Sequence, residues 1–414
     1  MIGPTRDYGP GGGSNPQSGD DEAVTPVASL FSDQGQELLA WLAGQDVTPD
    51  SSLRLASELR GRYPAELVSA ALTQQSLRIA GRAKFSRADS MYFTRAGLEQ
   101  ASSELTARHA AQRFAGRDLV ADLCCGIGGN LSALAGVAGR VLAVDADLGT
   151  LLFAQRNARV LGVPGEVTAV CADVQGLALR DSRLTGVFID PARRSDGRRL
   201  RTGDSLPPLA WCLDLAGQVP AVGIKAAPGI AHSLVPEDWE LEFVATGRSL
   251  KEALLWSPGL ATTPRRATLM PAGQTMTAIP GPPVPVQAPG SYLLDPSPAV
   301  TRAGLVEDLA RELGAWKIDP MIAFLAADRP VVTPFARTLR VLESMPWNER
   351  QVARRLRELG IGAADIRRRG LAGDVAQIHR RLGLQGEGSA MIVLTRRDGK
   401  PWGMICAPLL AGEG

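Results

Sequence analysis

The 414-residue sequence is poor in the residues that build covalent or metal-held frameworks. Its five cysteines are an odd number and include no C-x-x-C pair, which argues against a disulfide framework and a zinc site. The only histidines are His109, His232 and His379, so a histidine-rich metal centre is not expected. No apolar run reaches the roughly 18 to 20 residues of a membrane span, and the N-terminus lacks a basic-then-apolar signal pattern. We therefore expect a cytoplasmic protein with no metal and no membrane partner.

The chain also has almost no excess charge of either sign, because its net charge is only +2. Bulk charge therefore predicts no partner. Its distribution is more informative, since the segment from Val331 to Gly414 holds fourteen Lys/Arg against eight Asp/Glu. Lysine is scarce and arginine is common throughout, as in coding sequences of high-GC genomes. The basic tail is thus compatible with nucleic-acid contact and with codon bias alike.

The chain is organised around residues 117–130, which read RDLVADLCCGIGGN. A short apolar run is followed by glycines and then by leucines at helical spacing, which predicts a strand, a tight turn and a helix. Glycines at such a turn let backbone N–H groups approach a nucleotide-like cofactor. A dinucleotide site needs G-x-G-x-x-G, but Leu131 stands at the sixth position. The pattern D-x-x-x-G-x-G, from Asp122 through Gly126 to Gly128, instead has the form of motif I of S-adenosylmethionine-dependent methyltransferases.

Three further apolar strands follow, and each ends in an aspartate. The predicted strands span 119–123, 140–145, 167–173 and 186–190, and they deliver Asp122, Asp145, Asp173 and Asp190. Open α/β sheets bind ligands at the carboxyl edge of their strands. One such aspartate is more often a helix cap or turn residue. Four at equivalent places favour a ligand site, in which Asp145 has the spacing of a residue that holds a ribose.

Two other groups near this site have a structural and a functional interpretation. Cys124 and Cys125, in the glycine turn, are more readily small apolar residues under a cofactor than a nucleophile. The arginines after the fourth strand (Arg193, Arg194, Arg198, Arg199 and Arg201) form either a solvated loop or a phosphate contact. The sequence does not decide between these two interpretations of the arginines.

The chain divides into five predicted segments. These are a disordered tail at 1–28, a helical region at 29–115, a methyltransferase domain at 116–272, a Pro-rich linker with a connecting helix at 273–330, and a small α+β domain at 331–414. The third has seven predicted strands, which include 220–225, 239–245 and 266–270. Within the second we expect one helix over 97–113. The fold class is α/β, a Rossmann-like seven-stranded sheet with an N-terminal helical cap.

These residues carry a resemblance to a known family. The segments DLCCGIGGN, RVLAVDAD and AQRNARVLGV look like the catalytic core of class I methyltransferases of the trimethylguanosine synthase type. With Phe93-Thr94 and residues 98–102 ahead of motif I and a basic tail, the chain is similar to bacterial methyltransferases with a C-terminal THUMP-like domain. The resemblance implies S-adenosylmethionine as cofactor and an RNA substrate, either tRNA or rRNA. It implies no particular oligomeric state.

The resemblance also implies roles for individual residues. Asp122 would hold the methionine amino group, and Asp145 the ribose hydroxyls. Asp173 would accept a hydrogen bond from the adenine amino group. Gly126 and Gly128 would pass under the cofactor. A segment with Gln100 and Ser102 would close over it.

The catalytic motif departs from the family pattern. Amine-methylating relatives carry Asp/Asn/Ser-Pro-Pro and an aromatic residue, whereas this chain has Asp190-Pro191-Ala192-Arg193. We expect Asp190 to orient the acceptor or take its proton, Pro191 to shape the turn, and Arg193 to stack on a base through its guanidinium plane. Uracil C5 methylation needs a cysteine nucleophile near the following strand, and residues 225–228 have none. A base amine is therefore the favoured target.

Three hypotheses follow from the sequence. The first is an RNA methyltransferase whose basic tail contacts phosphates. The second is a methyltransferase of a small molecule or protein. The third is a catalytically silent RNA-binding protein with the same fold.

Overall fold

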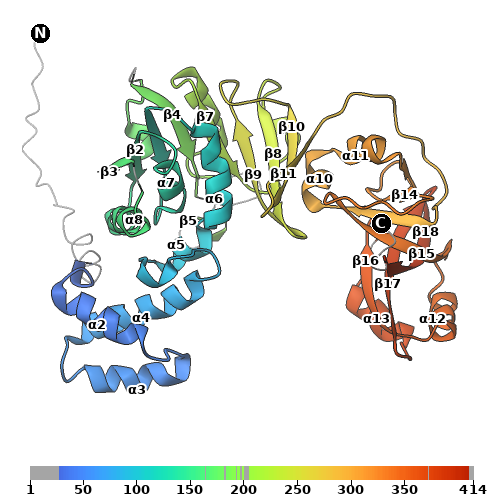
Figure 1. Ribbon diagram of the computed structural model, residues 1–414, viewed down its shortest axis with the longest axis horizontal. Coiled ribbons are helices and arrows are strands. Elements are labelled where there is room, and N and C mark those ends of the chain that lie inside the picture. The colour runs from blue at the N-terminus through green and yellow to red at the C-terminus, as the bar shows by residue number, and fades with distance from the viewer. Residues whose placement is uncertain are drawn as a thin grey trace, which may run out of the picture. The chain divides into compact units, whose positions relative to one another are not determined.

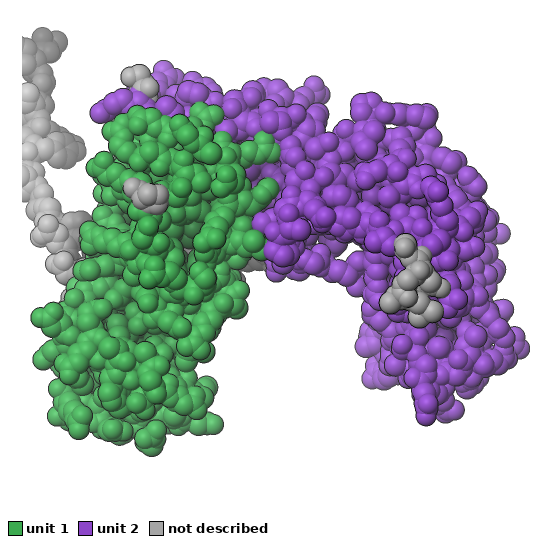
Figure 2. All heavy atoms as spheres, viewed as in Figure 1, with its two compact units in different colours: residues 1–177 green, residues 178–414 purple. Residues whose placement is uncertain are grey.

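A computed structural model describes residues 28–163, 165–180, 183–192, 194–195, 198–199, 205–371 and 373–409. The chain forms two compact units, residues 1–177 and residues 178–414 (Figure 2). Helices and strands of each unit are labelled in Figure 1. The two units are described in turn.

Unit 1 begins with three helices, α2 (Asp33–Ala43), α3 (Pro49–Leu59) and α4 (Ala65–Gly81), which lie together in Figure 1. The Ser32 side chain accepts a hydrogen bond from the Gly35 amide, and Thr48 and Ser51 form a capping box at α3. Such caps satisfy amides that a helix start leaves without a partner. The helices enclose an apolar core that includes Leu38, Leu42, Leu55, Val68 and Ala71.

The single helix expected over 97–113 is wrong, because the structure has two helices there. These are α5 (Arg95–Gln100) and α6 (Glu104–Ala111), followed by a short 3₁₀ turn at Gln112–Phe114. Ala101 is extended, with φ −55° and ψ 140°, and the Ser103 hydroxyl accepts from the Thr106 amide. Serine side chains compete for backbone amides and so start helices. Ser102 is therefore held in an extended link between the two helices.

Three parallel strands form the sheet part of unit 1, in the order β1 (Leu119–Leu123), β2 (Arg140–Asp145) and β3 (Glu166–Cys171). Helices α7 (Gly129–Leu134) and α8 (Leu148–Leu161) connect them. The register pairs Leu123 with Val144 and Asp145 with Cys171. The strands therefore end at one shared edge, where the motif I turn follows β1.

Unit 2 contains a six-strand segment of mixed sheet. Its order is β4 (Leu184–Ile189), β7 (Val222–Ala226), β9 (Ser249–Trp256), β8 (Glu240–Thr246), β10 (Arg265–Met270) and β11 (Gln274–Thr277), with α9 (Leu209–Asp214) between β4 and β7 in the chain. Residues 194–195 and 198–199 pair as the short strands β5 (Arg194–Ser195) and β6 (Arg198–Arg199). Strand β9, which the sequence analysis did not predict, lies antiparallel between β7 and β8.

A seven-stranded sheet occupies the C-terminal part of unit 2. Its order is β13 (Trp316–Lys317), β14 (Leu325–Ala327), β12 (Tyr292–Pro296), β15 (Ala336–Pro346), β18 (Lys400–Pro408), β17 (Gly388–Arg397) and β16 (Ile361–Arg368). Helices α12 (Glu349–Glu358) and α13 (Val375–Leu382) lie beside β16 in Figure 1. Strand β18 was not expected from the sequence.

The interval 273–330 differs from the expected linker and connecting helix. It contains β11, which pairs with β10, and three strands of the seven-stranded sheet. Its helical part is two helices, α10 (Pro298–Ala303) and α11 (Val306–Leu313), separated at Gly304, whose φ is 73°. Glycine adopts this left-handed conformation readily, and it ends helices for that reason. The proline-rich residues therefore connect strands within unit 2.

The seven-stranded sheet has an apolar core on each face. Alternate residues of β17 point to opposite faces, so Ile392 and Leu394 join the core under α12 and α13. Met391 and Val393 join the other core, with Leu293 of β12 and Leu339 of β15. Asp295 is two residues from Leu293 on β12, and Arg337 is two residues from Leu339 on β15. Their side chains therefore point to this second face.

Among the described residues, no helix is long and apolar enough to cross a membrane. Nor does the described part of the chain hold a group of three or more His, Cys, Asp or Glu residues arranged for a metal ion.

The side chain of Asn157, on α8, ties three segments of unit 1 together. It is fully buried, and its Nδ2 donates to the Tyr92 carbonyl at 2.9 Å and to the Ile127 carbonyl at 2.8 Å. Its Oδ1 accepts from the Tyr92 amide at 2.8 Å. From the other side, Arg78 Nε of α4 donates to the Met91 carbonyl at 2.9 Å. The segment that leads into α5 is thus fixed to the motif I turn.

Replacing Asn157 should therefore destabilise unit 1. Asn157→Ala leaves three buried backbone groups without their partner, and we expect a loss of about 3 kcal/mol in the free energy of unfolding. Urea denaturation followed by circular dichroism measures it. Gln34→Ala, at an exposed position of α2, is the control and should change stability by less than about 0.5 kcal/mol. Equal stability of the two variants would contradict the role given to Asn157.

Candidate active site

Three aspartates stand at the carboxyl edge of the unit 1 strands, as the sequence predicts. Asp122, the fourth residue of β1, is fully buried. Asp145 ends β2 and is half-buried, and Asp173, which is exposed, follows β3. The Asp173 Oδ1 accepts from the Gln175 amide at 3.0 Å. The carboxylates thus form a series of increasing exposure along one edge.

Asp145 closes the motif I turn by hydrogen bonds. Its Oδ2 accepts from the Gly126 amide at 2.9 Å, and its Oδ1 accepts from the Asp147 amide at 3.0 Å. A carboxylate oxygen has two lone pairs, so each oxygen retains capacity for a second donor. The structure therefore brings Asp145 and Gly126 together and leaves Asp145 able to accept from a ligand.

The two predicted glycines of the turn differ in what surrounds them. Gly126 has a φ of 55°, and a methyl group added there would meet no atom within 4 Å. Gly128 has a φ of 85°, and an added Cβ would lie 3.0 Å from the Ala154 Cα of α8. Gly128 is thus required by packing against α8, whereas Gly126 borders open space.

The link between α5 and α6 packs on the same turn. A Cβ added to Gly97 would lie 2.4 Å from Ile127 Cγ2, and one added to Gly129 would lie 3.4 Å from the Ser102 carbonyl oxygen. The Ser102 hydroxyl is buried and has no hydrogen-bond partner among the described residues. Gln100 is exposed at the end of α5. Ser102 therefore lies beside the turn with an unused hydroxyl, and Gln100 lies at its margin.

The two cysteines of the turn do not have the properties of a nucleophile. Burial raises the pKa of the Cys125 thiol far above its ordinary value, and the carboxylates of Asp122 and Asp145 raise it further. A thiol in this state stays protonated and inert. Cys124 is half-buried with a φ of 59°. Cys125 therefore acts as a small apolar residue next to both acids, and the exposed thiol in this region is Cys171 at the end of β3.

In unit 2, the catalytic motif predicted at 190–193 follows β4. The Asp190 Oδ2 accepts from the Lys225 ammonium of β7 at 2.6 Å. The Lys225 side chain is 6% exposed and that of Asp190 is 20% exposed. A buried ammonium needs such a partner, because removing its charge from water is costly. Asp190 is therefore fixed by a buried cation and still reaches the surface.

The residues around Asp190 are only partly described. Pro191 is buried, and Ala192 exchanges backbone hydrogen bonds of 2.9 Å with Leu206. Arg193 lies outside the described residues. The side chains of Arg194, Arg198 and Arg199, and all of Arg201, lie outside them as well. The predicted contacts of the arginine loop therefore stay predictions.

The loop after β7 is held by the helix that follows β12. Arg302 of α10 donates from Nε to the Pro228 carbonyl at 3.1 Å, and from Nη2 to the Ile230 carbonyl at 2.9 Å. Its guanidinium also lies over the Phe243 ring, 5.5 Å from the ring centroid, which is within the roughly 6 Å of a cation–π contact. The chain after Lys225 is thus anchored to the C-terminal part of unit 2.

Two site residues were missed by the sequence analysis. Lys225 stands in an otherwise apolar buried strand, and a lysine in that position predicts a carboxylate partner. Asn157 lies four residues after the buried Phe153 of α8, on the apolar face of the helix. Each is a polar residue at a core position, and that was the signal available.

Comparisons with known proteins agree with this architecture. A family model of RNA cap guanine-N2 methyltransferases matches residues 117–191, one of THUMP domain-like regions matches residues 336–408, and a domain of unknown function matches residues 23–81. An uncharacterised S-adenosylmethionine-dependent methyltransferase of Mycobacterium tuberculosis, in strains CDC 1551 and H37Rv, is 38% identical over 310 residues. The match covers 73% of this chain and 84% of the relative.

The fold is shared with a solved structure. A crystal structure of a methyltransferase from Porphyromonas gingivalis W83 superposes with a TM-score of 0.75 at 22% identity, covering 94% of this chain and 99% of that one. The chain belongs to the S-adenosylmethionine-dependent methyltransferases. The predicted enzyme class, its cofactor, the Rossmann-like fold and the THUMP-like region are thereby confirmed.

The unit 1 edge fits that cofactor. S-adenosylmethionine offers an ammonium group, two ribose hydroxyls and an adenine amine, which are all hydrogen-bond donors. The carboxylates of Asp122, Asp145 and Asp173 are acceptors at the ends of three adjacent strands. The open space at Gly126 and the unused Ser102 hydroxyl lie at the same turn. The donors of the cofactor thus match the kind of acceptor that this edge presents.

Alanine substitutions at the two glycines should separate packing from cofactor binding. Gly128→Ala places a methyl group against α8, and we expect it to lower stability by about 2–3 kcal/mol. Gly126→Ala has only the cost of its left-handed backbone, about 1 kcal/mol, but its methyl group enters the open space. The Gly126→Ala variant should bind S-adenosylmethionine at least tenfold more weakly than wild type, as measured by calorimetry.

Gly162→Ala is the matched control. Its φ is 63° and an added methyl group meets nothing within 4 Å, as at Gly126, but it ends α8 away from the turn. It should therefore lose similar stability and keep the wild-type affinity for the cofactor. Equal affinities of Gly126→Ala and Gly162→Ala would show that the space at Gly126 does not receive the cofactor.

Proposed function

We propose that this protein methylates an exocyclic amine of a base in tRNA or rRNA. The observation that carries the proposal is the ion pair of Asp190 and Lys225, which presents a fixed carboxylate directly after β4. An RNA substrate is supported by the two family descriptions, an RNA cap guanine-N2 methyltransferase over 117–191 and a THUMP domain-like region over 336–408. The surplus of arginine after Val331 supports it as well.

In the proposed mechanism the cofactor is held by residues of unit 1. Asp122 binds the methionine amino group, Asp145 the ribose hydroxyls and Asp173 the adenine amine. Gly126, Gly128, Gln100 and Ser102 complete its binding site. The bound cofactor supplies a methyl group on a sulfonium, which is already activated for displacement. What remains for the protein is orientation of the acceptor.

Asp190 is proposed to orient that acceptor. A carboxylate accepts a hydrogen bond from an amine N–H, and this hydrogen bond aligns the nitrogen lone pair. The carboxylate also receives the proton that the nitrogen loses. Lys225 is a positioning residue, because its ammonium holds Asp190 from the buried side. Pro191 shapes the turn, and Arg193 is proposed to stack on the base through its guanidinium plane.

Uracil C5 methylation is disfavoured by the state of Cys212, a candidate thiol between β4 and β7 in the chain. Cys212 lies on α9 and is fully buried, and burial raises the pKa of its thiol to about 12. At neutral pH this group is a thiol rather than the nucleophilic thiolate. This supports amine methylation over the covalent route.

The proposal assigns the segments 29–115 and 116–272 to the helical cap and the methyltransferase domain, and 331–414 to RNA binding. Residues 273–330 contribute to both sheets of unit 2. The five cysteines are free thiols, and an RNA substrate is available in the cytoplasm, so we place the activity there.

Cofactor binding tests the unit 1 half of the proposal. Asp145→Ala removes a charge-assisted acceptor worth about 1.5–3 kcal/mol, so affinity for S-adenosylmethionine should fall by about 10- to 150-fold. Calorimetry measures it. Asp118→Ala, an exposed acid paired with Arg140 at the surface, is the control and should bind as wild type does. Wild-type protein that binds no S-adenosylmethionine would contradict the proposed site.

Methyl transfer tests the unit 2 half. Wild-type protein should place label from S-adenosyl[methyl-³H]methionine into total bacterial tRNA or rRNA, in a ribonuclease-sensitive form. Asp190→Ala should lower kcat at least 100-fold and leave cofactor affinity unchanged. Nucleoside mass spectrometry identifies the product, and 5-methyluridine in place of an amine-methylated base would contradict the proposal.

Lys225→Met should lower kcat with little effect on cofactor affinity, because Asp190 loses its ion pair with the buried ammonium. We expect a loss of at least tenfold, and a thermal melt shows whether the variant stays folded. Lys251→Met, an exposed lysine on β9, is the matched control. A Lys225→Met variant with wild-type kcat would leave Lys225 without a positioning role.

A further inference from the structure

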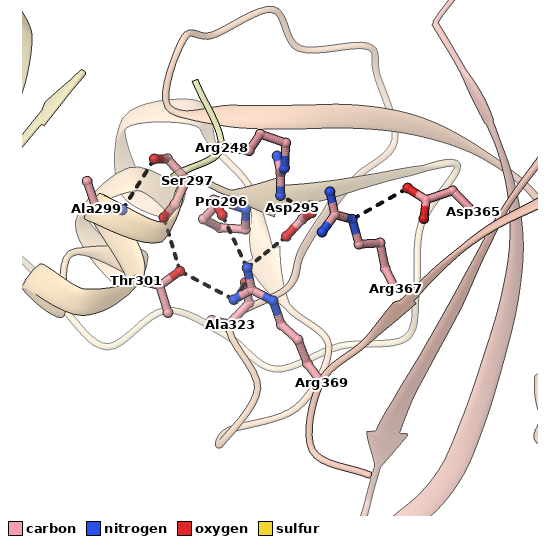
Figure 3. A network of polar contacts seen from close by, with 10 residues as sticks. All are labelled: Arg248, Asp295, Pro296, Ser297, Ala299, Thr301, Ala323, Asp365, Arg367 and Arg369. Carbon is pink, nitrogen blue, oxygen red and sulfur yellow. Dashed lines mark hydrogen bonds and ion pairs between the residues drawn. The ribbon is translucent and has the colours of Figure 1, made fainter. Parts of the chain in front are cut away.

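A cluster of arginines surrounds one buried carboxylate in unit 2. Asp295, at the end of β12, has a side chain that is 2% exposed. It accepts from Arg369, which follows β16, at 2.8 Å, and from Arg248, in the turn between β8 and β9. Figure 3 shows Arg248 pointing toward Asp295 from the β8–β9 turn, and Arg367 and Arg369 pointing toward it from the end of β16. One carboxylate thus joins the seven-stranded sheet to the turn between β8 and β9 of the six-strand segment.

The positive charge of this cluster exceeds its negative charge. Burial is the largest cause that lowers the pKa of Arg248, and Asp295 opposes it. Three further guanidiniums lower that pKa, and so lie close enough to repel Arg248: Arg337, Arg367 and Arg369. Asp295 can neutralise only one of the four cations.

Two of the arginines have unused hydrogen-bonding capacity. Arg337 stands opposite Asp295 in the β12–β15 register, and no hydrogen bond or ion pair joins its side chain to another described residue. The Arg367 Nε is buried without a hydrogen-bond partner among the described residues. Its ion pair with Asp365, at 3.8 Å, involves a carboxylate that is 62% exposed and therefore well screened. Among the described residues, no carboxylate forms an ion pair with Arg337, and Arg367 pairs only with the exposed Asp365.

A phosphate group matches what is missing. Its oxygens are all acceptors, and a guanidinium binds two of them with its planar fork. We propose that Arg337 and Arg367, supported by the Arg248–Asp295–Arg369 ion pairs, form a binding site for a phosphodiester of the RNA substrate. The inference rests on the proposed function and adds to it a defined contact between the RNA backbone and the C-terminal sheet.

The position of this site couples it to the loop after β7. Strand β12 leads from Asp295 into α10, and Arg369 also donates to the Thr301 hydroxyl on that helix at 3.3 Å. The next residue, Arg302, binds the carbonyls of Pro228 and Ile230. A phosphate held at the cluster is therefore fixed relative to the chain that follows Lys225. The site would set the position of the RNA relative to the loop after β7.

The test is a double variant, Arg337→Gln with Arg367→Gln, each substitution also being made alone. Arg354→Gln with Arg357→Gln, at exposed positions of α12, is the control, because it removes the same charge from the same unit. RNA binding is measured by fluorescence anisotropy of a labelled oligonucleotide between 50 and 200 mM salt. One lost phosphate contact lowers the slope of log K against log salt by about 0.7–0.9.

We expect the double variant to bind RNA about tenfold more weakly with a slope reduced by about one contact, and the control to keep the wild-type slope. In a second arm, inorganic phosphate is compared with chloride at equal ionic strength in thermal melts. Phosphate should stabilise wild type and control but not the double variant. A double variant that matches the control in both arms overturns the site.

Failure of the proposed function gives a different result. Wild-type protein that neither binds nor methylates RNA, but still binds S-adenosylmethionine, contradicts the RNA substrate and the RNA part of this inference. The phosphate arm still decides whether the cluster is an anion site. Stabilisation that is lost only in the double variant upholds that site, and equal stabilisation in all three proteins overturns it. The single variants give the answer if the double variant does not fold.

Discussion

One buried amide sets the geometry of the cofactor half. Asn157 satisfies the amide and carbonyl of Tyr92 and the carbonyl of Ile127. These groups lie in the segment that leads into α5 and in the motif I turn, so neither can shift without leaving a buried polar group unpaired. The stacking of Tyr92 on Phe153 of α8, at 5.7 Å between ring centroids, acts in the same direction. The placement of Ser102 beside the glycines follows from this constraint.

Unit 2 depends on a comparable buried side chain, the carboxylate of Asp295, whose partners are charged side chains. Asp295 is bound by arginines from the β8–β9 turn and from the segment after β16, and α10 follows it directly. Arg302 then extends the connection to the loop after β7. The seven-stranded sheet is therefore connected to the six-strand segment of unit 2 through Asp295 on β12 and Arg302 on α10.

The features that could be predicted from the sequence are those with a local signal. Apolar runs that end in aspartate gave β1, β2 and β4, and the glycines gave the motif I turn. Strand β9 was missed because Lys251, Glu252, Ala253 and the leucines after them are typical of helices, and only its place between β7 and β8 makes it a strand. The partners of Lys225 and Asn157 are 35 and 65 residues away, so no local pattern could reveal them.

The distribution of thiols around the cofactor edge has a practical consequence. Of the five cysteines, Cys171 alone is exposed, whereas burial raises the pKa of Cys212 and Cys406 to about 12 and that of Cys125 still further. Cys171 ends β3, two residues before Asp173. An environment-sensitive dye attached at this natural thiol would stand next to the acid proposed to bind adenine. The chain thus carries a built-in position from which occupancy of that edge can be read as fluorescence, without an introduced cysteine.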